Sequence, residues 1–95
     1  MSTVLVIDDD PDMRELERTA LSCDGHEVML ASNGSEGLRE LERKRPCVIL
    51  LDLMMPVMDG WQFRRQQIQR TEFATIPVIV VSAAGKERIA EIDAD

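Results

Sequence analysis

Short apolar segments alternate along the chain with longer segments in which apolar residues recur at helical spacing. Residues 3–7 (TVLVI) and 47–51 (CVILL) are apolar at almost every position, which is typical of strands buried on both faces of a parallel sheet. Residues 76–81 (IPVIVV) show the same pattern, with a proline near the strand start, where no ladder donor is needed. Residues 27–31 (EVMLA) predict a further short strand. The pattern therefore predicts four strands.

The segment between the first two predicted strands carries helix signals. Asp10 precedes Pro11, a pair typical of an N-cap and a first-turn proline. Apolar residues then recur at helical spacing up to Asp24-Gly25, where we expect this helix to end. These residues are Met13, Leu16, Ala20 and Leu21.

A second helix is expected before Pro46. Asn33, with Glu36 three residues later, has the form of an N-cap and its reciprocal partner. Leu38 and Leu41 follow as its apolar positions.

A third helix is predicted to begin after Asp59, which is a suitable N-cap, and to include Trp61, Phe63 and Ile68. A fourth helix is expected from Lys86 to Ile92.

Strand and helix alternate four times with short connections, which favours βαβ units with helices on both faces of a parallel sheet. We therefore predict one α/β domain over residues 1–95, with a flavodoxin-like doubly wound sheet in the strand order 2-1-3-4. Residues 92–95 (IDAD) contain no glycine C-cap or proline. We accordingly expect the domain to be C-terminally incomplete, ending in or just after a helix.

Polar residues follow three of the predicted strands. Asp8 and Asp9 follow the first strand, Asp52 follows the third and Ser82 follows the fourth. In parallel α/β sheets, ligands bind outside the carboxyl ends of the strands, where the strand order reverses. Because the first and third strands are expected to be neighbours, Asp8 and Asp9 should lie roughly 5 to 10 Å from Asp52.

Carboxylates so close together would raise each other's pKa or bind a cation, and an all-oxygen site with few protein ligands suits Mg²⁺. Such an ion could neutralise an incoming phosphoryl group. Asp52 stands alone at the centre of the edge and is the expected nucleophile, whereas Asp8 and Asp9 are better suited to holding metal.

Three segments together, VLVIDDD, ILLDLMMPVMDG and VIVVSA, resemble the receiver domain of two-component response regulators. The resemblance implies that Asp9 and Asp52 bind Mg²⁺ directly with the backbone carbonyl of Met54, while Asp8 acts through water. It also implies that Asp52 accepts a phosphoryl group from a phosphohistidine, on a sensor histidine kinase or a phosphotransfer protein. Ser82 matches the switch hydroxyl of the family.

The chain departs from the family pattern near its end. In the family a fifth strand with a lysine and a proline follows, with a switch aromatic and a fifth helix, and Lys86 is not that lysine because it lies only four residues beyond Ser82. We expect the fourth strand to be an open edge. Either the sequence is part of a longer protein, or a partner chain completes the sheet by dimerisation or strand exchange.

Composition excludes several other classes of protein. The formal net charge of -7 opposes direct binding of nucleic acid. We found no apolar run long enough for a membrane span and no basic signal-peptide start, so we expect a cytoplasmic protein. Cys23 and Cys47 lack metal-site spacing and are expected to be reduced core thiols. With His26 as the single histidine, a zinc cluster or a Ser-His-Asp triad is not favoured.

Simpler structural roles are favoured for several residues. Asp10 and Asp59 are expected to cap helices, and Trp61 to be half-buried. The loop methionines Met54, Met55 and Met58 are expected to pack against the sheet, with Met58 also a candidate for a partner surface. Residues 43–45 and 64–65 are expected to be solvated basic faces.

Two alternative functions remain open beside the role of signal receiver. One is a receiver-like interaction module that does not depend on phosphorylation, suggested by the missing lysine. The other is a magnesium-dependent phosphatase of the haloacid-dehalogenase kind, although Leu53 and Met54 after Asp52 do not fit its usual D-x-D-x-T signature. The absence of G-x-G-x-x-G after the first strand excludes a dinucleotide-binding fold.

Overall fold

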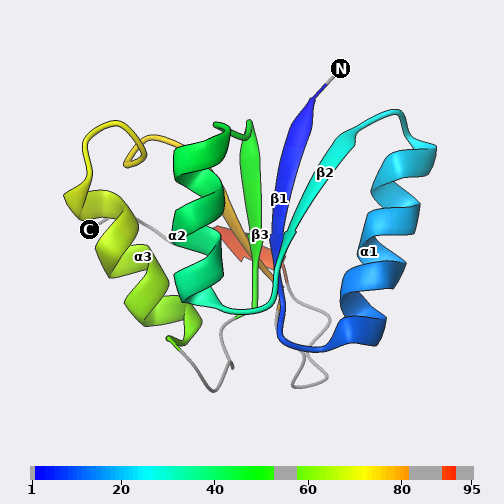
Figure 1. Cartoon of the computed structure of the whole chain (residues 1–95), viewed down its shortest axis with the longest axis horizontal. Coiled ribbons are helices and arrows are strands. Elements are labelled where there is room, and N and C mark those ends of the chain that lie inside the picture. Colours follow the sequence, from blue (N-terminus) through cyan, green and yellow to red (C-terminus); the bar gives the residue numbers. More distant parts are fainter. Residues whose placement is uncertain (1, 53–57, 82–88, 92–95) are drawn as a thin grey trace.

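The segments predicted as strands form one sheet in a computed structural model that describes residues 2–52, 58–81 and 89–91 (Figure 1). Strand boundaries lie within two residues of those expected for the four predicted strands. The elements in chain order are β1 (Thr3–Ile7), α1 (Pro11–Cys23), β2 (Glu27–Ala31), α2 (Gly34–Arg43), β3 (Val48–Leu51), α3 (Gly60–Gln69), β4 (Val78–Val81) and β5 (Ile89–Glu91).

The strand order of the sheet is β2-β1-β3-β4-β5. β1 pairs in parallel with β2 and with β3, and β3 pairs in parallel with β4. In the register of the sheet, Leu5 lies opposite both Met29 and Ile49. The predicted flavodoxin-like order 2-1-3-4 is therefore confirmed.

The prediction of a helix from Lys86 to Ile92 is wrong for residues 89–91. These residues form β5, which pairs antiparallel with β4 through Val80 and Ala90; residues 86–88 and 92 lie outside the described part of the chain. An edge strand presents unpaired N–H and C=O groups, and an antiparallel partner can reach them through a short connection. Pairing with this edge outweighs the weak preference of a short sequence for helix. The prediction that β4 is an open edge is therefore wrong where β5 pairs with it.

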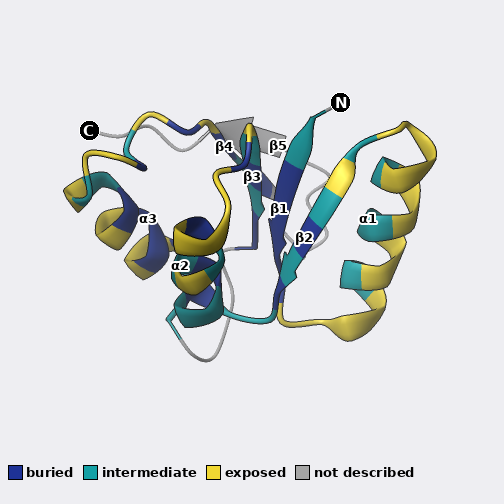
Figure 2. Ribbon diagram, turned by 45° about the horizontal axis from the view of Figure 1, so that its top comes forward, coloured by how far each residue is buried: buried dark blue, intermediate teal, exposed yellow. Residues whose placement is uncertain are grey.

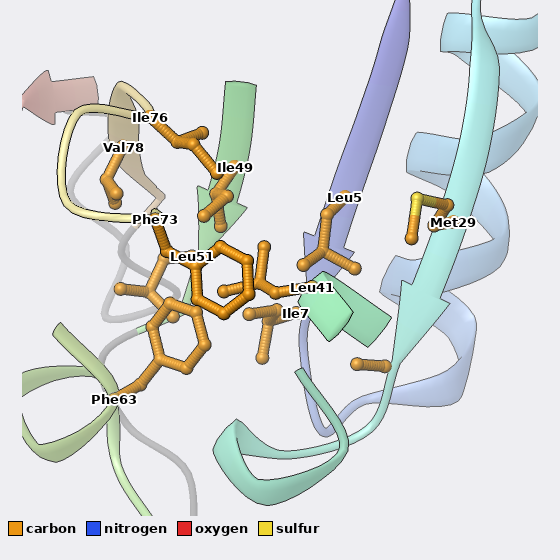
Figure 3. Packing of buried hydrophobic residues seen from close by; sticks show 11 residues of the cluster. Leu5, Ile7, Met29, Leu41, Ile49, Leu51, Phe63, Phe73, Ile76 and Val78 are labelled. Carbon is orange, nitrogen blue, oxygen red and sulfur yellow. The ribbon is translucent and has the colours of Figure 1, made fainter. Parts of the chain in front are cut away.

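The main core lies between the sheet and the helices α2 and α3, which occupy the face opposite α1 (Figures 1 and 3). Because side chains alternate along a strand, every second strand residue points to this face. Phe63 from α3 and Leu41 from α2 cover them, each at most 2% exposed. The strand residues in this cluster are Leu5, Ile7, Met29, Ala31, Ile49, Leu51 and Val78.

The opposite face is covered less completely. α1 contacts β1 and β2, contains no fully buried residue and is exposed along much of its length in Figure 2. Leu16 is 63% exposed although it follows Met13 at helical spacing. The strand residues that alternate with the main core are only partly buried in β3 and β4, namely Val48, Leu50 and Ile79.

The predicted N-caps are confirmed. The Asp10 side chain accepts hydrogen bonds from the backbone N–H groups at the start of α1, and Asn33 accepts one from the Glu36 N–H. Asp59 forms a full capping box with Gln62. The expected reciprocal bond from Asn33 to Glu36 is wrong, however, because the Glu36 carboxylate accepts from Ser32 instead.

Two other expectations about side chains are corrected, and one is confirmed. Cys23 and Cys47 are free thiols, but both are exposed and neither belongs to the core. Trp61 is half-buried as expected, with 53% of its surface exposed. Arg65 is exposed as expected, whereas Arg64 is buried and its Nη1 donates to the Gln67 Oε1 at 2.7 Å.

The buried Gln67 side chain holds the connection between α3 and β4. Its amide nitrogen donates to the backbone carbonyls of Phe73 at 2.8 Å and Ile76 at 3.2 Å. Arg45 reinforces this connection from outside by donating to the Glu72 carbonyl and to Thr75 Oγ1. In the described part of the chain, no helix is long and apolar enough to cross a membrane.

Candidate functional site

The sheet places two aspartates side by side at its carboxyl edge. β1 ends at Ile7 and β3 ends at Leu51, and these residues lie opposite one another in the parallel register. Asp52 continues the hydrogen-bonding ladder, because its N–H donates to the Ile7 carbonyl at 2.9 Å. On the other side of β1, the Asp8 N–H donates to the Ala31 carbonyl at 3.1 Å. Strand pairing therefore determines where both backbones lie.

Three carboxylates converge at this edge. One carboxylate oxygen from each of Asp8, Asp9 and Asp52 lies within 4.8 Å of the others. Asp8 and Asp52 are only 5% and 3% exposed, while Asp9 is exposed. The predicted convergence of these side chains is confirmed. The site consists of two buried carboxylates with a third at its mouth.

Local hydrogen bonds orient Asp8. Its Oδ1 accepts from the Asp10 N–H at 2.9 Å, and its backbone carbonyl accepts from Arg14 Nη1 at 2.8 Å. The first of these bonds joins the acidic site to the N-cap of α1, because Asp10 is that N-cap. The start of α1 and the acidic site therefore form one hydrogen-bonded unit.

The pKa of the Asp8 carboxyl is raised, chiefly by burial. The negative charges of Asp9 and Asp10 raise it further, while hydrogen bonds from the Asp10 N–H and with Asp52 act in the opposite direction. Burial disfavours a charged carboxylate, and so does a nearby charge of the same sign. The cluster is therefore poised to take up a cation or a proton.

Glu17 is a fourth acidic residue near this site, and the sequence-based prediction missed it. It lies on α1, and the pKa of its carboxyl is raised to about 7. Burial is the main cause, and the negative charges of Asp8 and Asp52 add to it. A signal was present, because Glu17 is four residues from both Met13 and Leu21 and therefore shares their face of the helix. The prediction instead placed Leu16, the apolar residue next to Glu17, on the inward face of the helix, but Leu16 is exposed.

The chemistry of these donors fits a hard divalent cation. Three carboxylate oxygens within 4.8 Å can surround one ion, and Mg²⁺ characteristically uses one or two carboxylates while keeping several waters. Asp9 is exposed, so this side of the site is open to water. Two other residues predicted for the site, Met54 and Ser82, lie outside the described residues.

Comparisons with known proteins agree with this arrangement. The model of the response regulator receiver domain family matches residues 4–94. The chain is 34% identical to the protein PilH of Pseudomonas aeruginosa, over 92% of this chain and 72% of PilH. It is 40% identical to the response regulator MprA of Mycobacterium leprae, over 96% of this chain but only 40% of MprA.

Solved structures show the same fold. The N-terminal domain of a response regulator receiver protein from Methanoculleus marisnigri matches with a TM-score of 0.82 and 34% identity, over 84% of this chain and 65% of that one. The chemotaxis protein CheY4 of Vibrio cholerae matches with a TM-score of 0.81 and 31% identity, over 84% of this chain and 67% of CheY4. Sequence, fold and the acidic edge of the sheet together assign the chain to the response regulator receiver domains of two-component systems.

Proposed function

We propose that this domain accepts a phosphoryl group on Asp52, with Mg²⁺ bound at the acidic edge of the sheet. The convergence of Asp8, Asp9 and Asp52 carries this proposal, since their carboxylate oxygens lie within 4.8 Å of one another. The donor would be a phosphohistidine of a sensor histidine kinase or of a phosphotransfer protein. The protein would act in the cytoplasm as a stoichiometric signal receiver and not as an enzyme.

Each carboxylate has a distinct role in this proposal. Asp9 and Asp52 would hold the ion together with the Met54 carbonyl, and Asp8 would bind one of its waters. When bound, Mg²⁺ neutralises charge on the transferring phosphoryl group. Asp8 and Asp52 are both buried, and the hydrogen bond from the Asp10 N–H to Asp8 Oδ1 orients the Asp8 side chain.

The chemical step is a displacement at phosphorus. A carboxylate oxygen of Asp52 forms a new bond to the phosphorus atom as the P–N bond of the phosphohistidine breaks. The imidazole leaves with the bonding electron pair. Ser82, which follows β4, would then donate a hydrogen bond to a phosphoryl oxygen, a charge-assisted interaction available only after modification.

The test is phosphorylation of the purified chain by acetyl phosphate, with and without Mg²⁺, measured by intact-protein mass spectrometry. We expect one phosphoryl group, dependent on Mg²⁺ and absent in Asp52→Asn. Asp12→Asn is the matched control, because Asp12 is an exposed carboxylate in the first turn of α1.

Two outcomes would redirect the proposal. Modification that persists in Asp52→Asn would reject Asp52 as the acceptor. Failure of acetyl phosphate to modify a folded, Mg²⁺-binding longer chain that carries the family's fifth-strand lysine would favour the second candidate, a receiver-like interaction module that works without phosphorylation.

A further inference from the structure

The middle of α1 turns a carboxylate towards the sheet and an apolar side chain towards solvent. Leu16 is 63% exposed, whereas Glu17 is partly buried like Met13 and Leu21 on the same face. The Oε1 atom of Glu17 is fully enclosed and has no hydrogen-bond partner among the described residues. An enclosed carboxylate oxygen without a donor or a cation is unfavourable. A nearby positive charge would therefore stabilise the ionised form of Glu17 in this position.

The charges that act on Glu17 come from the acidic site. Asp8, at the end of β1, and Asp52, at the end of β3, both disfavour its ionised form. The neighbouring cations of α1 have other partners: Arg14 donates to the Asp8 carbonyl, and Arg18 pairs with Glu15 at 2.7 Å. Within the described chain, no ion pair neutralises Glu17.

We propose that Glu17 is a fourth carboxylate of the acidic site, whose negative charge strengthens the binding of a divalent cation by Asp8, Asp9 and Asp52. Glu17 would not be a ligand of the ion. Its negative charge would attract the ion at a distance and so strengthen its binding by the three aspartates. The inference rests on the Mg²⁺ site of the proposed function.

The physical reason is mutual stabilisation. A divalent ion is the largest charge in such a site and reverses the local repulsion. It would favour the ionised form of Glu17, and by linkage the ionised form of Glu17 favours the ion to the same extent. The pKa of about 7 for Glu17 in the absence of the ion supports this coupling, because the carboxyl then ionises in the neutral range.

The test is a Mg²⁺ titration of the full 95-residue chain at pH 6 and pH 8, followed through the backbone amide signals of Asp9 and Asp52 by NMR. At pH 8 we expect Glu17→Gln to bind Mg²⁺ about fivefold more weakly than wild type, the size expected for one charge acting through partly solvated protein. The gain in affinity between pH 6 and pH 8 should be smaller in Glu17→Gln. It should not vanish, because the pKa of Asp8 is also raised.

Two further variants separate this effect from structural change and from net charge. Glu17→Leu removes the charge and places an apolar side chain on the inward face of α1. It should weaken Mg²⁺ binding as much as Glu17→Gln does. Glu15→Gln makes the same change in net charge on the exposed side of α1, and it should leave the affinity close to that of wild type.

The inference is overturned if both Glu17 variants bind Mg²⁺ like wild type at pH 8, or if Glu15→Gln weakens binding equally. In that case Mg²⁺ binding by wild type and its loss in Asp52→Asn would still support the proposed function. Failure of the wild-type chain to bind Mg²⁺ at all would instead remove the proposed site and this inference together.

Discussion

Met58 packs so closely against Gly34 that no side chain fits between them. A Cβ atom at Gly34 would lie 2.7 Å from Met58 Cγ and 2.8 Å from the Met58 carbonyl oxygen. Met58 has a φ of 51°, which is uncommon for a residue other than glycine. It also packs against the main core. The first residue of α2 therefore lies directly against Met58, the residue before the N-cap of α3.

Gly34→Ala should lower the free energy of unfolding by about 1–3 kcal/mol, the usual cost of overpacking. Alanine favours helix by up to about 1 kcal/mol over glycine, but that gain is outweighed because the backbone of Met58 would have to move. Urea denaturation measures the change. Ser35→Ala, at the next position of α2, is the control and should change stability little. A Gly34→Ala chain as stable as wild type would show that there is room for a methyl group between residue 34 and Met58.

Gln67→Leu should be among the most damaging substitutions in α3. The Gln67 side chain is 0% exposed, and its removal leaves the buried carbonyls of Phe73 and Ile76 and the Arg64 guanidinium with one partner fewer. The expected loss is about 2–4 kcal/mol, because unsatisfied buried polar groups keep their desolvation cost. Thermal and urea denaturation would measure it. Gln66→Leu, on the exposed side of the same helix, should stay within about 0.5 kcal/mol.

Local signals in the sequence predicted most of the fold. The strands over residues 3–7 and 27–31 match the prediction at both ends, since consecutive apolar residues and short turns determine them locally. The cap at Asp10 depends only on the residues that follow it. Pairing of residues 89–91 with β4 could not be predicted, because it depends on an edge formed by a distant segment.

The acidic site was predicted for the same reason as the strands. Asp8 and Asp52 follow directly from strand ends, and parallel pairing brings strand ends together. Glu17 and Gln67 were missed because polar residues usually face solvent. Each shares a helix face with inward-facing apolar residues, Met13 and Leu21 for Glu17 and Phe63 for Gln67.

Glu36 should contribute stability that disappears in acid. Its carboxylate accepts hydrogen bonds from the Ser32 hydroxyl and from the Ser32 N–H, both at 2.7 Å, and these bonds lower its pKa below 4.5. A lowered pKa stabilises the fold above the unfolded value, and that stability is lost as the pH falls through the folded value. Glu36→Gln should therefore cost about 1 kcal/mol at pH 7. Urea denaturation should show this cost shrinking from pH 5 to pH 3.5, whereas a constant cost would contradict an ionic role.

Glu17 should make the protein less stable as the pH rises from 5 to 7.5 when no divalent cation is present. Its pKa is raised from 4.5 to about 7 in the folded state. Its stabilising effect is therefore complete below pH 4.5 and is lost as the pH rises through 7. Because the side chain is only partly buried, solvent screening reduces the expected loss to about 1–2 kcal/mol.

Urea denaturation in EDTA at several pH values, followed by the fluorescence of Trp61, would measure this slope. Glu17→Gln should flatten it, because the amide does not titrate. The carboxyls whose pKa values are lowered, such as that of Glu36, act below pH 4.5 and do not mask the effect. Asp8 has a raised pKa and acts in the same direction, from 3.8 upwards, so a small slope should remain. Equal slopes in wild type and Glu17→Gln would mean that the enclosed Glu17 carboxyl does not titrate in this range.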